Sequence, residues 1–205
     1  MDPYDIKKAL PALYAPKPGD FHVVEVPDLP FLMIDGHGDP NVSPAYVEAV
    51  QALFTLSYAV RAIAKSELGR VHTVGPLEGL WSAQDPRVFV AGDRSAWEWT
   101  MAISQPAWIT HDIIKTATKR VEKKALAALD RVYFTHYTEG MSVQILHVGS
   151  YDSEAPVLAR LHDEYLPTHG LTFNGKHHEV YLSDARRTDP AKLRTILRQP
   201  VASIS

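Results

Sequence analysis

The chain has 205 residues, of which 45% are hydrophobic and 22% are charged, and its formal net charge is -3 at pH 7. This balance is that of an ordinary globular protein. It gives no reason to expect a nucleic-acid partner, which usually needs a concentrated basic face. With zero cysteines, the chain offers no disulfide framework, no thiol nucleophile and no thiolate metal site.

The N-terminus has no basic segment followed by a long apolar run, so no signal peptide is apparent. No stretch approaches the roughly 18 apolar residues of a membrane-spanning helix. We therefore expect a soluble, cytoplasmic protein with no membrane partner. The sequence does not indicate the oligomeric state, and a monomer is compatible with it.

The first half of the chain alternates short apolar strands with amphipathic helices. Residues 1–20 contain four prolines and predict an irregular leader. Ser43 is a suitable N-cap for the first long helix, and Pro44 suits its first turn. In chain order, the patterns predict strands over 21–27 and 30–40, a helix over 43–67, strands over 77–82 and 97–104, and a helix over about 109–128.

The second half repeats this order of elements. It predicts a strand over 141–149, a helix over about 153–165, a strand over 177–183, and a last helix over about 190–197 capped by Asp189. The turn GDPNVSPAYVEAV (38–50) resembles GSYDSEAPVLARL (149–161). LEGLWS (77–82) likewise matches HEVYLS (178–183), which aligns Glu78 with Glu179.

This weak internal repeat predicts an α+β fold made of duplicated strand-helix-strand-strand modules. We expect a single domain over residues 1–205, with a first module at about 21–105 and a second at about 130–201. The modules should lie side by side about a pseudo-two-fold axis and share an antiparallel sheet. Module junctions commonly bind small ligands, so we expect a ligand cleft there.

The stretch HHEVYLSD (177–184) carries the first candidate site. Alternation along a strand sends His177, Glu179 and Tyr181 to one face and His178 to the other. A carboxylate among aromatic neighbours could act as a general acid or base, or it could pair with a cationic ligand. The alternative is an exposed glutamate at a sheet edge.

A metal site at His177, His178 and Glu179 is disfavoured by the same alternation. Adjacent histidines in a strand point to opposite faces, so they cannot easily share one ion, and no third ligand is evident. The stretch also lacks the spacing of a helical HExxH pair.

The four tryptophans, Trp81, Trp97, Trp99 and Trp108, fall within 28 residues of one another. Alternation places Trp97 and Trp99 on one face of their strand. Aromatic side chains on one face of a strand more often pack in the core, but the same side chains could stack on a flat aromatic ligand.

Five stretches resemble the GyrI-like small-molecule-binding family: MIDGHGDPN (33–41), PLEGLW (76–81), WEWTMAISQPAWIT (97–110), VQILHVGSYDSEAP (143–156) and HHEVYLSDARRTDPAKLRTILRQPV (177–201). The resemblance covers nearly the whole chain, and its C-terminal stretch is the most specific part. Within this family, the sequence resembles the stand-alone branch, in which the domain is not fused to a DNA-binding module. This branch implies a duplicated fold with a ligand cleft between its halves.

Some stand-alone members are described as cyclopropanoid cyclopropyl hydrolases, which open the cyclopropane of DNA-alkylating antibiotics by adding water. The resemblance implies that Glu179 acts as acid or base, and that Tyr181 and the tryptophans hold the flat drug. The resemblance also implies that Glu78, Tyr58 and His147 bind the ligand, because of where they lie relative to the matching motifs.

The implied activity requires neither a metal nor an organic cofactor, and its partner is a hydrophobic aromatic small molecule. The first alternative is a non-catalytic protein that sequesters aromatic, often cationic, drugs. A weaker alternative is an interaction protein that inhibits DNA gyrase.

Overall fold

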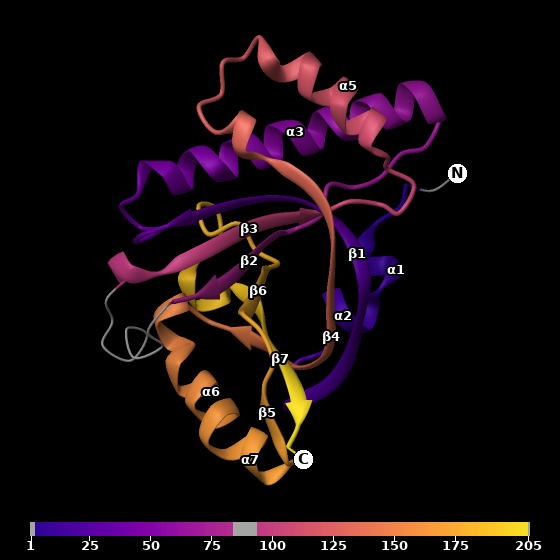
Figure 1. Ribbon diagram of the computed structural model, residues 1–205. Coiled ribbons are helices and arrows are strands. Elements are labelled where there is room, and N and C mark those ends of the chain that lie inside the picture. The colour runs from indigo at the N-terminus through magenta and orange to yellow at the C-terminus, as the bar shows by residue number, and fades with distance from the viewer. Residues whose placement is uncertain (1–2, 84–93, 205) are drawn as a thin grey trace.

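The computed structural model describes residues 3–83 and 94–204. Within them, seven antiparallel strands form one sheet in the order β4-β1-β3-β2-β6-β7-β5. Strand β4 pairs with both β1 and β7, so six strands close into a barrel-like ring, and β5 extends the far end of β7 (Figure 1). This closure leaves few unpaired strand edges.

The strands are β1 (His22–His37), β2 (Leu77–Ser82), β3 (Glu98–Ser104), β4 (Tyr133–Val148), β5 (Leu171–Phe173), β6 (His177–Tyr181) and β7 (Arg194–Ser203). The α-helices are α1 (Ile6–Ala9), α2 (Pro11–Tyr14), α3 (Pro44–Leu68), α5 (His111–Glu122), α6 (Ala155–Ala159) and α7 (Leu166–Thr168). A π-helical turn, η4 (Arg160–Tyr165), joins α6 to α7. Short 3-10 turns are η1 (Arg94–Ala96), η2 (Leu129–Arg131), η3 (Tyr151–Ser153) and η5 (Pro190–Lys192).

The ring divides into two similar halves. Around it run β1, β3 and β2 of the first half, then β6, β7 and β4 of the second. Within the ring, each half has the chain order strand, helix, strand, strand, with α3 in the first and the α6–α7 segment in the second. The second half adds the short strand β5 between α7 and β6, outside the ring. The predicted α+β fold with duplicated strand-helix-strand-strand units is therefore confirmed, and the halves meet where β1 pairs with β4 and where β2 pairs with β6.

Helices α3 and α5 cover the outer face of the first half (Figure 1). Helix α3 begins at Pro44 after the predicted cap Ser43, and it ends at Gly69, whose φ of 63° lies in the left-handed region. By length and composition, α3 could span a membrane, but half of its most apolar window is buried inside the fold. Its buried residues pack on Leu32, Ile34 and Met101 of the sheet, as in the core helix of a globular protein.

The α6–η4–α7 segment covers the outer face of the second half (Figure 1). Leu161 and Leu166 pack there against Val143, Ile145 and Leu197. The outer face therefore carries two apolar cores, one under each helical layer.

The inner face of the ring is closed by the N-terminal segment. Residues 1–20 were predicted to be irregular, but α1 and α2 form within them, and Leu13 and Tyr14 are buried against Val26, Val180 and Ile196. A proline at N1 starts α2, so the proline content that predicted a loop is compatible with a short helix.

Three further predictions of secondary structure were wrong. The last predicted helix, over 190–197, is a single 3-10 turn, η5, followed by strand β7. Helical periodicity and the Asp189 cap were locally plausible, but pairing with both β4 and β6 decides the structure of this segment. The two strands over 21–27 and 30–40 form one strand, β1, and the strand over 141–149 begins eight residues earlier, at Tyr133.

Candidate active site

Three adjacent strands build the candidate site on the outer face of the sheet. The register places Glu179 of β6 opposite Gly79 of β2 and Leu197 of β7. Tyr181 follows on the same face, opposite Thr195. Paired residues of antiparallel strands share a face, so these residues all lie on the outer face. Because β2 belongs to the first half and β6 to the second, they also lie where the two halves meet.

A chain of hydrogen bonds holds Glu179. The indole Nε1 of Trp81 donates to the hydroxyl oxygen of Tyr181 at 3.1 Å, and this hydroxyl donates to Glu179 Oε2 at 2.7 Å. His177 Nε2 lies 3.5 Å from Glu179 Oε1, and the Glu179 side chain is 15% exposed. Burial and the charge of Glu179 raise the pKa of Tyr181 well above its usual value, so Tyr181 keeps its proton at neutral pH.

Gly79 makes room for this arrangement. A Cβ at this position would lie 2.8 Å from Trp81 Nε1 and 3.1 Å from the Tyr181 hydroxyl. The side chains of Trp81 and Tyr181 therefore meet directly above Gly79, which has no side chain.

Aromatic rings form the wall on the side of the first half. Tyr46, in the first turn of α3, stacks over Trp81 with centroids 6.5 Å apart and meets Trp99 edge-on at 5.3 Å. Trp97 meets Trp81 edge-on at 5.5 Å. Trp81 and Trp99 are buried in the core, whereas Tyr46 and Trp97 are partly exposed and are the rings that a ligand could reach.

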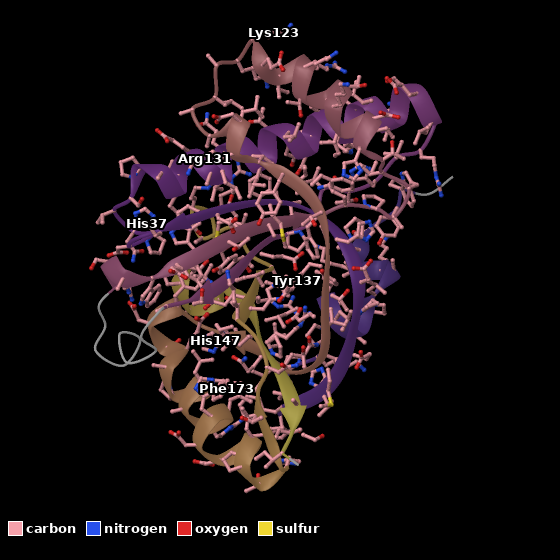
Figure 2. All side chains as sticks on the ribbon, in the orientation of Figure 1. His37, Lys123, Arg131, Tyr137, His147 and Phe173 are labelled. Atoms are coloured by element: carbon pink, nitrogen blue, oxygen red, sulfur yellow. The ribbon has the colours of Figure 1, made fainter. Side chains whose placement is uncertain are left out.

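The turn before α6 forms the wall on the side of the second half. Tyr151 meets the Tyr181 ring edge-on at 5.8 Å, and Glu154 is buried three residues later. His147 of β4, labelled in Figure 2, is paired with Thr195. Its Nε2 lies 3.1 Å from Ser153 Oγ, so His147 also contacts this turn. Burial and the charges of Glu154, Glu179 and Asp184 raise the pKa of Tyr151 to about 12.

Glu78 does not belong to this site. The repeat had aligned Glu78 with Glu179, but Glu78 is opposite Val180 in the register and points to the inner face of the ring. An alignment that preserves the faces is shifted by one residue and matches Glu78 with His178, and Trp81 with Tyr181. A shift by one residue exchanges the two faces of a strand.

The inner face instead carries a buried polar cluster, which we call the barrel network: Tyr14, Glu78, Glu139, Gln144, His178 and Arg198. His178 Nε2 lies 3.1 Å from Glu78 and its Nδ1 lies 2.9 Å from Glu139. Tyr14 donates to Glu78 at 3.2 Å, and Arg198 donates to Glu139 at 3.2 Å. Burial alone would lower the pKa of His178, but the two carboxylates raise it to about 9.

Two other predicted ligand-binding residues lie away from Glu179. Tyr58 is 58% exposed on helix α3. Trp108 packs edge-on against Tyr4 and carries the guanidinium of Arg70 over its ring, 3.9 Å from the centroid.

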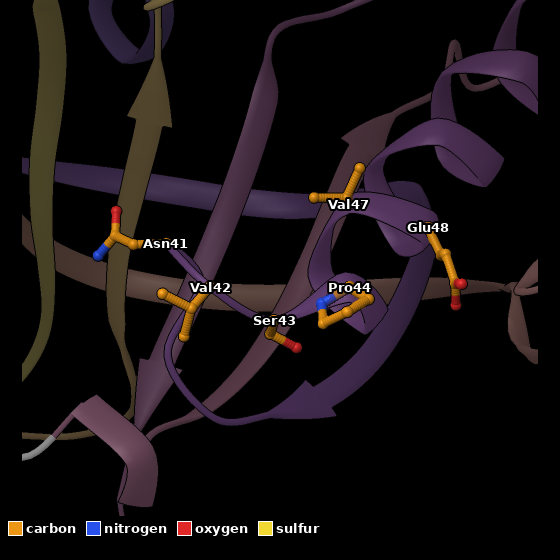
Figure 3. A pocket seen from close by; sticks show the side chains of 6 residues that line it. All are labelled: Asn41, Val42, Ser43, Pro44, Val47 and Glu48. Carbon is orange, nitrogen blue, oxygen red and sulfur yellow. The ribbon is translucent and has the colours of Figure 1, made fainter.

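Two shallow hollows lie beside the candidate site rather than over Glu179. One, of about 440 Å³, follows the turn into α3 and is lined by Asn41, Val42, Ser43, Pro44, Val47 and Glu48 (Figure 3). Tyr46 belongs to the same turn but contacts Trp81 and Trp99. The other, of about 480 Å³, is lined in part by Lys176 and by His37 and Arg131, which Figure 2 labels.

Sequence reasoning missed Tyr46, Tyr151 and Glu154 as site residues. All three lie in the two turns that the repeat had matched, 38–50 and 149–161. Since both turns lead from a first strand into a helix of the same layer, the repeat itself could have placed them at the junction.

Comparisons with known proteins agree with this architecture. A family model described as GyrI-like small molecule binding domain matches residues 19–202. A comparison with curated proteins found no match. Among solved structures, an uncharacterized conserved protein from Listeria innocua is 36% identical, with a TM-score of 0.89, over 97% of this chain and 100% of that chain.

Two further structures carry a hydrolase name. One hydrolase from Listeria innocua is 34% identical, with a TM-score of 0.87, over 98% of this chain and 100% of that chain. Another is also 34% identical, with a TM-score of 0.84. The C-terminal domain of EcmrR shares the fold at 12% identity and a TM-score of 0.56. Because the family model spans most of the sequence, this chain belongs to the GyrI-like small-molecule-binding domain family.

Proposed function

We propose that this protein is a cofactor-independent hydrolase that opens the cyclopropane of flat, alkylating antibiotics by adding water, and so detoxifies them. The observation that carries the proposal is the Trp81–Tyr181–Glu179 chain of hydrogen bonds between two aromatic walls. The hydrolase names of two relatives at 34% identity support a hydrolytic activity. A cytoplasmic location is part of the same proposal.

Glu179 is the base in this mechanism. The substrate is a cyclopropane conjugated to a dienone, and water attacks a ring carbon. A C–O bond forms, a C–C bond of the cyclopropane breaks, and its electron pair moves through the conjugated system to the carbonyl oxygen. Glu179 takes a proton from the attacking water, a transfer typically worth about 10²–10⁴-fold in rate.

Tyr181 positions the base. Its hydroxyl donates to Glu179 Oε2, and Trp81 fixes the hydroxyl in turn. The other oxygen, Oε1, lies 3.5 Å from His177 Nε2 and is the atom that would take the proton of the water. The rings of Tyr46 and Trp97 offer faces and edges on which a flat aromatic substrate can stack.

The test is incubation with a cyclopropane-containing antibiotic, with the product followed by mass spectrometry. The wild type should convert the drug to a product heavier by one water. Glu179→Gln should bind the drug but turn it over about 10²–10⁴-fold more slowly. Glu25→Gln, which changes an exposed strand glutamate, is the matched control and should react like the wild type.

Non-catalytic binding is the second candidate function. It is favoured by a carboxylate among aromatic rings, an arrangement that also suits a cationic aromatic ligand. In that case the drug is recovered unchanged from the wild type, and Glu179→Gln weakens the affinity for cationic drugs more than for neutral ones. This outcome would refute the hydrolase.

A further inference from the structure

Glu154 is a second carboxyl group at the candidate site. It follows η3 and precedes α6, and its residue is only 5% exposed. Among the described residues, its Oε1 atom is buried without a hydrogen-bond partner. A buried carboxyl oxygen without a partner is costly unless the group is neutral or is used by a ligand.

The surroundings of Glu154 favour its neutral form. Burial and the charge of Glu179 raise its pKa, Asp152 adds to this, and the Thr195 hydroxyl opposes it, so that the pKa is about 9. The titratable groups around it are Tyr151 and Asp152 of its own turn, Glu179 and Tyr181 of β6, and His147 of β4.

We propose that Glu154 is the proton donor of this enzyme, acting on the substrate's carbonyl oxygen while Glu179 accepts the proton of the attacking water. This inference rests on the proposed hydrolase function. A carboxyl group that keeps its proton, in the turn that leads into α6 and next to Glu179, can supply the acid of a pair that acid and base catalysis requires. The substrate class is thereby narrowed to cyclopropanes whose ring opening releases an electron pair onto an oxygen atom.

The protons and electrons of this step balance. The water oxygen bonds to carbon and its proton goes to Glu179. The electron pair of the broken C–C bond arrives on the carbonyl oxygen, which takes the proton of Glu154 and becomes a phenol. The step leaves Glu154 ionised and Glu179 protonated, and exchange of one proton through solvent restores both.

The other polar side chains nearby are less suited to this task. The Tyr181 hydroxyl already donates to Glu179, and its raised pKa makes it a weak acid. His147 Nε2 is occupied by the Ser150 carbonyl oxygen and the Ser153 hydroxyl. The Thr195 hydroxyl oxygen also has no partner among the described residues, but an alcohol is a far weaker acid than a carboxyl group. Glu154 is therefore the best proton donor of these side chains.

The first test does not depend on turnover. In protein labelled with ¹³C at the glutamate side-chain carboxyl, one resonance should titrate near pH 9 in the wild type. It should be absent in Glu154→Gln and should titrate lower in Glu179→Gln, because the charge that raises the pKa of Glu154 is gone. Glu164→Gln, an exposed position in the same helical segment, is the matched control. A Glu154 resonance that titrates near pH 4 would overturn the proposal.

The second test is the dependence of turnover on pH. Since the protonated form is the donor, wild-type turnover should fall as the pH rises through about 9. Glu154→Gln keeps the neutral shape, so it should fold, but it should turn over about 10²–10⁴-fold more slowly and lose this alkaline limb. Glu154→Asp should restore part of the rate.

The outcomes separate the two proposals. A Glu154→Gln variant as active as the wild type overturns the donor role alone, whereas the loss of activity in Glu179→Gln still supports the hydrolase. A wild type that turns over no cyclopropane overturns the hydrolase and the donor role together.

Discussion

The barrel network predicts a large loss of stability when one buried charge is removed. Glu139 is the anion between His178 and Arg198, and it is buried inside the ring. Glu139→Gln keeps the shape of the side chain but removes its charge. Among the described residues, the variant therefore leaves Arg198 without a carboxylate partner and leaves His178 with Glu78 alone.

The magnitude follows from the pKa of Glu139. Burial alone would raise it, but the His178 ring and the Arg198 guanidinium lower it from 4.5 to about 2. That difference corresponds to about 3 kcal/mol of stability. This loss of stability lies at the lower end of the range of roughly 3–5 kcal/mol that removal of one partner of a buried ion pair costs.

The network also predicts how the loss depends on pH. The contribution of Glu139 is fully present above its unfolded pKa of 4.5 and is lost as the pH falls toward 2. The contribution of His178 is fully present below 6.5 and is lost as the pH rises through about 9. The wild type should exceed the variant most clearly between pH 4.5 and 6.5.

The assay is urea unfolding at 25 °C and pH 6, repeated at pH 3 and pH 9. At pH 6, Glu139→Gln should lose about 3 kcal/mol, or about 6–12 °C in Tm for a chain of this size. The control is Asp28→Asn, which removes an exposed ion pair to His136 whose atoms lie 2.6 Å apart. The control should show no comparable loss. Equal losses in both variants, or a difference that is unchanged at pH 3, would refute this account.

Two glycines give further predictions. Gly36→Ala should destabilise the fold by about 1–3 kcal/mol, because its Cβ would run into the buried Trp99 indole; in the same urea assay Gly19→Ala, with open space around it, should change little. Gly79→Ala should separate Trp81 from Tyr181 and lower turnover of a cyclopropane-containing antibiotic; wild-type turnover in this variant would contradict the role given to that hydrogen bond.

Local patterns in the sequence predicted most of the elements. Strand alternation alone placed Glu179 and Tyr181 on one face, where they share a hydrogen bond. Alternation also placed Trp97 and Trp99 on one face, and both pack at the same apolar core, as the commoner of the two alternatives predicted. That the tryptophans bind a ligand stays a prediction. These predictions succeed because they depend on neighbours within a few residues of the same strand or helix.

The remaining features depend on contacts between distant segments. Residues 194–203 form a strand because β4 and β6 lie on either side of them, which no local pattern reveals. Arg198 contacts both Glu139 and the ring of Tyr14, although the three residues are far apart in the sequence. Whether Glu78 faced inward or outward depended on the register of β2 against β6, and the repeat misaligned that register by one residue.

The same register explains why the barrel network matters for the candidate site. His178 and Glu179 are adjacent on β6 and point to opposite faces, His178 into the network and Glu179 into the site. A slip of β6 by one residue would move the His178 imidazolium to the outer face and bury Glu179 against Leu146 and Ile196 on the inner face. Such a slip breaks the contacts of His178 with both Glu78 and Glu139, so the buried charges oppose it. The inner network therefore holds the strand that presents Glu179 and Tyr181 to the outer face.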